Sequence, residues 1–180
     1  MIRFFGGRVM TLANGIETQD IEVWTEGSKI VFVGKPKAEE LDGKVFEREY
    51  DLKGNLLMPS FKNAHTHSAM TFLRSYADDM PLQDWLFKQI FPMEAKLDGE
   101  KVYWLTKLAI LEYLTTGCTA AFDMYFELDD YVKACIESGF RSVLCGAVSG
   151  DKSNLERLEN NYLKYLSLIH ISEPTRLRCI

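Results

Sequence analysis

The sequence predicts an α/β fold, in which a small antiparallel β unit precedes βαβ units that form a parallel sheet. Residues 1–50 are a series of short strand-like runs separated by turn residues. Beyond Asp51, three short apolar runs alternate with three amphipathic helical patterns. The chain has 180 residues, of which 47% are hydrophobic, and this is enough for one core, or for one domain with a small second one.

The first fifty residues contain five strand-like runs. Asn14-Gly15 is a hairpin signal, and Gly34 and Pro36 close the most apolar of the runs. The expected strands are Ile2–Phe5, Arg8–Leu12, Ile21–Trp24, Ser28–Gly34 and Val45–Leu52. A β unit of this size is marginal alone, so we expect it to need further strands or a partner surface.

The second part alternates strands and helices. Leu56–Phe61 lacks polar alternation, as expected of a buried parallel strand. Asp98 fits the N-cap of the first helix and Gly117 fits its end. The expected core face of this helix is Val102, Leu105, Leu108, Ala109 and Leu111. The later elements are strand Ala120–Met124, helix Leu128–Ser138 ended by Gly139, strand Arg141–Cys145 and a helix over Asn154–Tyr165.

Two histidines, His65 and His67, follow the Leu56–Phe61 strand. Side chains at positions i and i+2 of an extended chain point the same way, so both imidazoles can reach one metal ion. Imidazole suits zinc, and also iron, copper and nickel. A catalytic zinc site needs at least three protein ligands, so this pair is only the start of one. The alternative is a pair of loop histidines with ordinary hydrogen bonds.

The connection that carries this pair is unusually long. Lys62 to Leu97 separates the first parallel strand from its helix, and it includes an amphipathic piece, Leu82–Ile90. Long connections at the carboxyl ends of barrel strands typically build active sites. We therefore expect a functional site to begin at the histidines.

Composition narrows the class of protein. The net charge is −5 without a basic stripe, which predicts no nucleic-acid or acidic-membrane partner. No apolar run approaches the roughly 18–20 residues that span a bilayer, and the N-terminus lacks the apolar stretch of a signal peptide. Cys118, Cys135 and Cys145 lie in apolar segments and show no metal-binding spacing, so buried reduced thiols are expected. We expect a cytoplasmic protein.

The last residues differ in character from the rest of the chain. Leu166–Arg176 resembles the in-frame translation of a transposase-type sequencing adapter, and the preceding helical pattern loses its charged face there. We therefore treat Leu166–Ile180 as a non-native tail, the alternative being a natural C-terminal segment. On this interpretation His170 is no candidate ligand, and the natural chain is longer.

The segment Met58–His67 resembles the amidohydrolase superfamily signature at the end of the first barrel strand. The methylthioadenosine/S-adenosylhomocysteine deaminase branch shares further segments, and related chlorohydrolases and guanine or cytosine deaminases share some of them. These segments are Ala77–Leu82, Asp84–Leu86, Phe91–Lys96 and Phe122–Tyr125. The resemblance implies a partial (β/α)8 barrel, with its first three βα units in residues 56–165. The N-terminal part of a composite β-sandwich would precede it in residues 1–55.

The resemblance also implies chemistry. One divalent metal ion, most often zinc, activates a water that attacks C6 of an adenine-type ring and releases ammonia, while a carboxylic acid shuttles protons. His65 and His67 match the first two metal ligands, and Glu94 matches a glutamate that binds ribose hydroxyls. Trp85 is a candidate lid residue, with helix packing as the alternative. The third histidine, the shuttle glutamate and the metal-binding aspartate belong to later strands, so no catalytic residue is assigned in this chain.

The expected substrate is a purine nucleoside such as 5'-methylthioadenosine or S-adenosylhomocysteine. Gly146 stands where relatives that take the latter have a carboxylate-binding arginine, which disfavours carboxylate-bearing substrates. Asp123, at the end of a strand, either bonds nearby backbone or belongs to the site. The alternatives are another ring deaminase or a chlorohydrolase, acting on guanine, cytosine or a triazine. A homo-oligomeric parent is left open.

An alternative from another class is that the 180-residue chain is a catalytically inactive truncated fragment. Three parallel strands would leave a bare sheet edge and an uncovered apolar face. We therefore expect the isolated chain to be insoluble or poorly folded.

Overall fold

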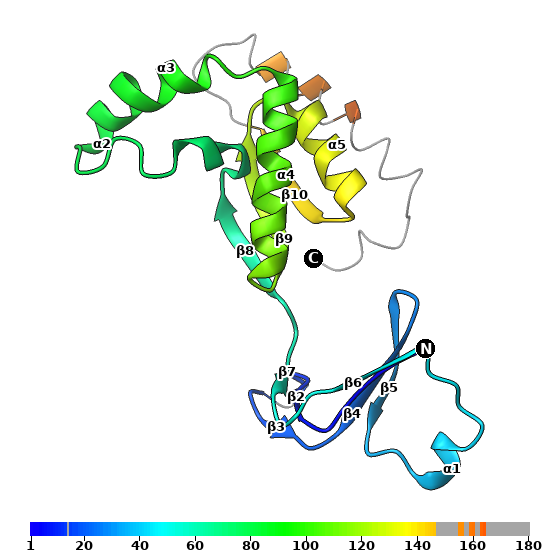
Figure 1. Cartoon of the computed structure of the whole chain (residues 1–180). Helices are drawn as coiled ribbons and strands as arrows, with labels where there is room; N and C mark the ends of the chain where they lie inside the picture. The colour runs from blue at the N-terminus through cyan, green and yellow to red at the C-terminus, as the bar shows by residue number, and fades with distance from the viewer. Residues whose placement is uncertain (14, 147–154, 157–158, 161–162, 165–180) are drawn as a thin grey trace. The chain divides into compact units, whose positions relative to one another are not determined.

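The computed structural model describes residues 1–13, 15–146, 155–156, 159–160 and 163–164. The chain forms two compact units, Met1–Ser60 and Phe61–Ile180. The first unit consists mainly of β-strands, and the second combines a parallel sheet with helices (Figure 1). The mixed α/β class predicted from the sequence is confirmed.

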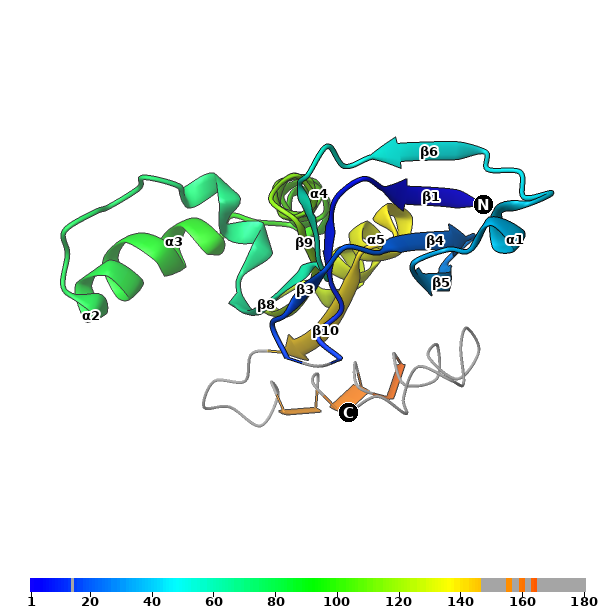
Figure 2. The ribbon, with the colours of Figure 1, turned by 90° about the horizontal axis from the view of Figure 1, so that it is seen from below.

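The first unit contains two small sheets. One has the strand order β5-β4-β1-β6, which can be followed in Figure 2. Its strands are β1 (Ile2–Phe5), β4 (Glu22–Glu26), β5 (Lys29–Gly34) and β6 (Arg48–Asp51). The other sheet joins β3 (Thr18–Gln19), β2 (Arg8–Met10) and β7 (Leu56–Leu57), and a short helix α1 (Ala38–Leu41) follows β5.

The prediction of a purely antiparallel unit is wrong. β1 pairs with β4 and β2 with β3 in antiparallel fashion, but β1–β6 and β2–β7 are parallel pairs. Parallel neighbours need a long connection, and these strands are far apart in the sequence. Alternation within each run carries no information on the direction of such a distant partner.

Arg3 ties three strands of the larger sheet together. Its guanidinium donates to Glu22 of β4 at 2.6 and 2.8 Å and to Glu49 of β6 at 2.9 Å. The hydrogen bond from Arg3 lowers the pKa of Glu22, and the same pairing raises the pKa of Arg3. Trp24, buried beside this network, stacks on Phe32 with ring centroids 4.1 Å apart.

The second unit is built on a parallel sheet with the order β10-β9-β8. Its elements are β8 (Phe61–Thr66), α4 (Gly99–Thr115), β9 (Cys118–Tyr125), α5 (Leu128–Ser138) and β10 (Arg141–Gly146). Helices α4 and α5 lie side by side (Figures 1 and 2), and their buried side chains pack against β9 in one core. The predicted βαβ order is confirmed.

The predicted strand Leu56–Phe61 is wrong in its bounds. Leu56–Leu57 forms β7 and pairs with β2 of the first unit, whereas the strand that precedes the histidines begins at Phe61. Pro59 has no N–H to give to a ladder, so the two strands are separated there. Phe61 is 61% exposed, contrary to the expectation of a fully buried strand.

The caps of α4 were predicted correctly, but its core face only in part. Asp98 accepts a hydrogen bond from the Lys101 backbone N–H at 3.0 Å, and Gly117 has a positive φ of 82°. Val102 and Ala109 are buried, but Leu108 and Leu111 are 44% and 59% exposed. Thr106 and Ile110 take their places in the core, because the buried face is centred on a different row of the helix.

The long connection between β8 and α4 is largely helical. It consists of η1 (Ser68–Leu73), α2 (Leu82–Asp84), the π-helical turn η2 (Trp85–Ile90) and α3 (Phe91–Glu94). This confirms helical structure over the predicted amphipathic piece. Turns of π-helix are frequent at functional sites.

Some sequence predictions fall outside the described residues. The helix expected over Asn154–Tyr165 is helical at 155–156, 159–160 and 163–164, and its other residues are not described. Asn14 and the tail 166–180 also lie outside, so the interpretation of the tail stays a prediction. Cys118 and Cys135 are buried, as expected, but Cys145 is only partly buried, contrary to the expectation.

Candidate metal centre

The two histidines lie together at the carboxyl end of β8. Their ring centroids are 5.1 Å apart, with the ring planes at 79° to each other. The β8–β9 register shifts between Asn63 and Thr66, so that over this interval β8 carries one residue more than β9. The Asn63 Oδ1 accepts the His65 backbone N–H at 3.1 Å, which satisfies this donor within the bulge.

One hydrogen bond selects the nitrogen that His67 can offer to a cation. Its Nδ1 lies 2.9 Å from the backbone oxygen of Met124 in β9. A carbonyl only accepts, so Nδ1 donates in this contact, and in the neutral imidazole the lone pair is on Nε2. A neutral imidazole oriented by such a bond is the usual form of a metal ligand, so the donor chemistry of His67 fits a divalent cation.

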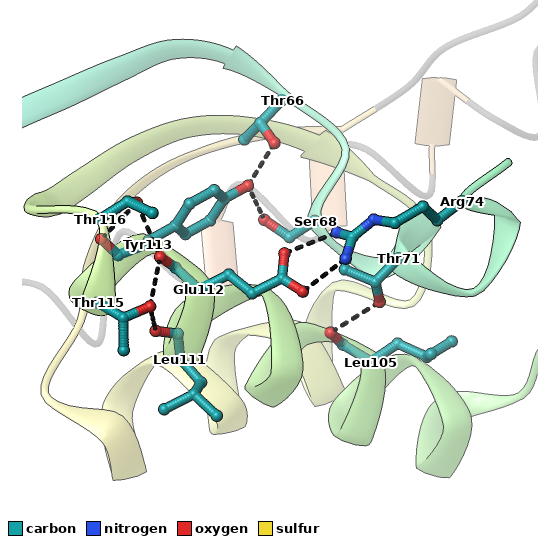
Figure 3. A network of polar contacts seen from close by, with 10 residues as sticks. All are labelled: Thr66, Ser68, Thr71, Arg74, Leu105, Leu111, Glu112, Tyr113, Thr115 and Thr116. Atoms are coloured by element: carbon teal, nitrogen blue, oxygen red, sulfur yellow. Dashed lines mark hydrogen bonds and ion pairs between the residues drawn. The ribbon is translucent and has the colours of Figure 1, made fainter.

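The residues on either side of His67 are also fixed. The Ser68 backbone N–H donates to both carboxylate oxygens of Asp123 at 3.2 Å. The Tyr113 hydroxyl contacts the Thr66 hydroxyl and lies 3.0 Å from the Ser68 hydroxyl, as Figure 3 shows. The turn that bears His67 is therefore held from both β9 and α4.

Asp123 acts as a structural acceptor for this turn. It is 1% exposed and bonds the backbone directly after His67. Burial raises the pKa of its carboxyl, and the hydrogen bonds from Ser68 oppose that rise. Of the two roles predicted for Asp123, the bond to nearby backbone is confirmed.

Glu94, the last residue of α3, is electrostatically coupled to this region. Burial raises the pKa of its carboxyl, and the Tyr125 hydroxyl and His67 both lower it. Tyr125 ends β9 and is 4% exposed. Its hydroxyl makes no hydrogen bond of normal geometry among the described residues, although it lies near enough to Glu94 to influence that pKa.

Trp85 lies apart from these groups. It lines an open hollow of about 300 Å³ beside the connection that leads into α2. The other lining residues are Ala77, Asp78, Asp79, Met80 and Leu82. No contact recorded for the described residues joins Trp85 to the histidines or to Glu94, so its role as a lid stays a prediction.

The histidine pair alone offers fewer than the three protein ligands that a catalytic zinc site needs. Within the part of the chain that the structure describes, no group of three or more His, Cys, Asp or Glu side chains could hold a metal ion. The expectation that further ligands come from later strands stays a prediction.

Sequence reasoning missed several groups that position the pair. The Met124 carbonyl is a backbone group and has no sequence signal. Tyr113 has the pattern of a helix core residue and gives no hint of its hydroxyl contacts. Tyr125 follows Asp123 by two residues at a strand end, and that spacing could have marked it as a neighbour of the site.

Comparison with known proteins identifies the family. The model of the amidohydrolase family matches residues 56–176. The chain belongs to the amidohydrolase family. Among solved structures of related fold are an adenosine deaminase from Xanthomonas campestris with bound zinc and a triazine hydrolase variant. The first has a TM-score of 0.76 and 25% identity, covering 91% of this chain and 47% of that chain. The second has a TM-score of 0.79 and 21% identity, covering 96% and 44%.

Curated relatives of this amidohydrolase are nucleoside deaminases. It is 43% identical over 136 residues to the 5-methylthioadenosine/S-adenosylhomocysteine deaminase of Desulfitobacterium hafniense, covering 76% of this chain and 31% of the relative. It is 40% identical over 161 residues to the 5'-deoxyadenosine deaminase of Methanocaldococcus jannaschii, covering 88% and 37%. The amidohydrolase chain thus spans about a third of the length of these relatives. None of its described helices is long and apolar enough to cross a membrane.

Proposed function

We propose that the full-length protein is a metal-dependent aminohydrolase that removes the 6-amino group of an adenine-type nucleoside. The observation that carries the proposal is the His65–His67 pair, in which a hydrogen bond to Met124 leaves Nε2 of His67 available to a cation. Membership in the amidohydrolase family and relatives named as adenine-nucleoside deaminases support it.

The proposed architecture follows from the same likeness. The sheet of β8, β9 and β10 would be the first part of a (β/α)8 barrel, and the unit Met1–Ser60 would contribute to a β-sandwich. In such barrels the carboxyl ends of the strands carry the active site, and the histidines follow the end of β8.

His65 and His67 would hold the cation, for which zinc is the first choice because two imidazoles suit it. When bound, a divalent ion of this kind lowers the pKa of a coordinated water to about 7. The described residues would do the rest of the positioning on this side of the site. Glu94 would accept hydrogen bonds from the ribose hydroxyls, and its half-buried place near His67 supports that role.

The substrate class can be narrowed by one residue. Gly146 ends β10 and offers no cation to an amino-acid carboxylate. Methylthioadenosine, 5'-deoxyadenosine and adenosine are therefore favoured over S-adenosylhomocysteine. The cytoplasmic location and the lack of nucleic-acid or membrane partners stay predictions.

Ammonia release by the full-length protein tests the proposal. The panel holds these four nucleosides, together with guanine, cytosine and a triazine, each with and without chelator. We expect chelator-sensitive deamination of the carboxylate-free nucleosides. His67→Ala should remove both metal and activity, and Glu94→Gln should keep the metal but raise KM for ribosides. Turnover that survives the chelator, or turnover confined to guanine, cytosine or triazine, contradicts the proposal.

A further inference from the structure

Tyr113 occupies an unusual position between α4 and the turn that carries His67. Its hydroxyl contacts the Thr66 hydroxyl and lies 3.0 Å from the Ser68 hydroxyl. The face of its ring stacks on Phe140, with centroids 5.5 Å apart and the planes at 21°. The phenol is therefore held by its ring in the core while its hydroxyl bridges the two residues that flank His67 (Figure 3).

The bridge lies where the backbone leaves β8. Thr66 is the last residue of the strand, Ser68 is the first of η1, and His67 between them has φ −133° and ψ 76°. The two hydroxyl contacts restrict the residues before and after His67. The direction of the imidazole depends on this short segment, because its Nδ1 must also reach the Met124 carbonyl.

Two further contacts dock η1 on the same helix. The Thr71 hydroxyl donates to the Leu105 carbonyl at 3.2 Å, and Arg74 donates to both carboxylate oxygens of Glu112 at 2.7 and 2.9 Å. Figure 3 shows all of these contacts along one side of α4. Tyr113 is the member of this set that reaches the residues adjacent to the histidine.

We propose that Tyr113 is a positioning residue for the metal centre, acting through Thr66 and Ser68 to hold His67 in its ligating orientation. The inference rests on the proposed function only in assuming a cation at His65 and His67. It assigns to α4, which supplies no ligand to the pair, control over how tightly that cation is held. Groups that orient a ligating histidine directly typically change metal affinity by about 10–100-fold when removed. Tyr113 acts one step further out, so an effect near the lower end is expected.

The test uses the full-length zinc-loaded enzyme and measures the rate at which zinc passes to a chromophoric chelator. Tyr113→Phe keeps the stacked ring and removes only the hydroxyl, and it should speed zinc release by about tenfold. Tyr103→Phe is the matched control. It removes a hydroxyl from the same helix, but that hydroxyl bonds Glu137 and should leave zinc release unchanged.

A double-mutant cycle separates positioning from a general loss of stability. In a background of Thr66→Val and Ser68→Ala, Tyr113→Phe should cause no further change in zinc release. Thr66→Val and Ser68→Ala alone should each give a smaller effect than Tyr113→Phe, which keeps the test informative if that variant folds poorly.

Four outcomes are distinguished by these experiments. Wild-type release rates in Tyr113→Phe, or an undiminished effect in the Thr66→Val/Ser68→Ala background, overturn the inference but leave the proposed function intact. If His67→Ala does not lower the zinc content of the full-length protein, both the inference and the proposed function are overturned. Faster zinc release in Tyr113→Phe, with no such acceleration when Tyr113→Phe is added to Thr66→Val/Ser68→Ala, supports the positioning role.

Discussion

Replacement of Tyr125 by Phe should make the protein more stable and at the same time weaken its binding of ribosides. The Tyr125 side chain is 4% exposed, and its hydroxyl has no hydrogen bond of normal geometry among the described residues. The same hydroxyl lowers the pKa of Glu94, which we propose to bind the ribose hydroxyls. One oxygen atom is thus unfavourable for folding and favourable for the site.

The two magnitudes follow from these surroundings. A buried polar group without a partner costs about 1–3 kcal/mol, and the attraction between the Tyr125 hydroxyl and Glu94 offsets part of that cost, so Tyr125→Phe should raise the free energy of unfolding by no more than about 1 kcal/mol. Without the hydroxyl, Glu94 is ionised less readily and accepts more weakly from the diol. A single hydrogen bond is worth about 0.5–1.5 kcal/mol, which corresponds to a rise of about twofold to twelvefold in KM.

The assay compares two substrates and two variants in the full-length enzyme. KM should rise for adenosine but not for 2',3'-dideoxyadenosine, which lacks the hydroxyls that Glu94 would bind. Tyr131→Phe is the control, because Tyr131 is 1% exposed in the same core but its hydroxyl contacts Ser142. It should lower the free energy of unfolding by about 1 kcal/mol and leave the ratio of the two KM values unchanged. Equal destabilisation by both variants, with no discrimination between the substrates, would refute the reasoning.

Three further predictions concern packing and charge. Burial raises the pKa of the Cys135 thiol to about 11 from 9.0, so Cys135 in the native protein should resist alkylation at pH 8. The label is read after digestion, in the tryptic peptide 134–141. Rapid labelling of Cys135 before the protein unfolds contradicts this. Arg3→Gln should lower the free energy of unfolding by about 2 kcal/mol near neutral pH. Because Arg3 depresses the pKa of Glu22 below its ordinary 4.5, that contribution is present above pH 4.5 and is lost as the pH falls through the pKa of Glu22 in the folded protein. The free energy of unfolding is therefore measured against pH for wild type and variant. Two curves that stay parallel in acid would be inconsistent with this reasoning. Gly99→Ala should not give the usual rise of up to about 1 kcal/mol in the free energy of unfolding, because the new Cβ would lie 2.0 Å from Asp130 Oδ2. The rise should appear when Gly99→Ala is made together with Asp130→Ala. Equal changes in the free energy of unfolding with and without Asp130→Ala argue against the clash.

Local signals in the sequence predicted the helices of the second unit well. Helix α5 has the bounds Leu128–Ser138 that the pattern indicated, and Gly139 follows it with φ 63°. A cap and a stop act within one turn, so the sequence next to them is sufficient to predict them. The core face of α4 was harder to predict, because this helix carries apolar residues on several of its faces. Only tertiary contacts decide that Leu111 is exposed.

Contacts between distant residues account for what could not be predicted. The parallel pairing of β1 with β6 joins residues more than forty positions apart, and Tyr113 meets Thr66 across 47 positions. No periodicity spans such distances. The histidine pair was predictable because its spacing is local. The proposed role of Glu94 needed the resemblance to a family, since a lone acid at the end of a helix carries no signal of its own.

The geometry of the pair differs from the simple alternation that first suggested it. An ideal strand would present His65 and His67 on one face with the same kind of backbone support. In the structure His65 lies within a bulge, and its N–H is satisfied by Asn63, while His67 lies beyond the strand in a turn fixed by β9 and α4. Bulges re-aim side chains near functional sites. The two rings therefore meet through two separate departures from regular β structure, and a change at Asn63 should disturb His65 without loosening the hydrogen bond of His67.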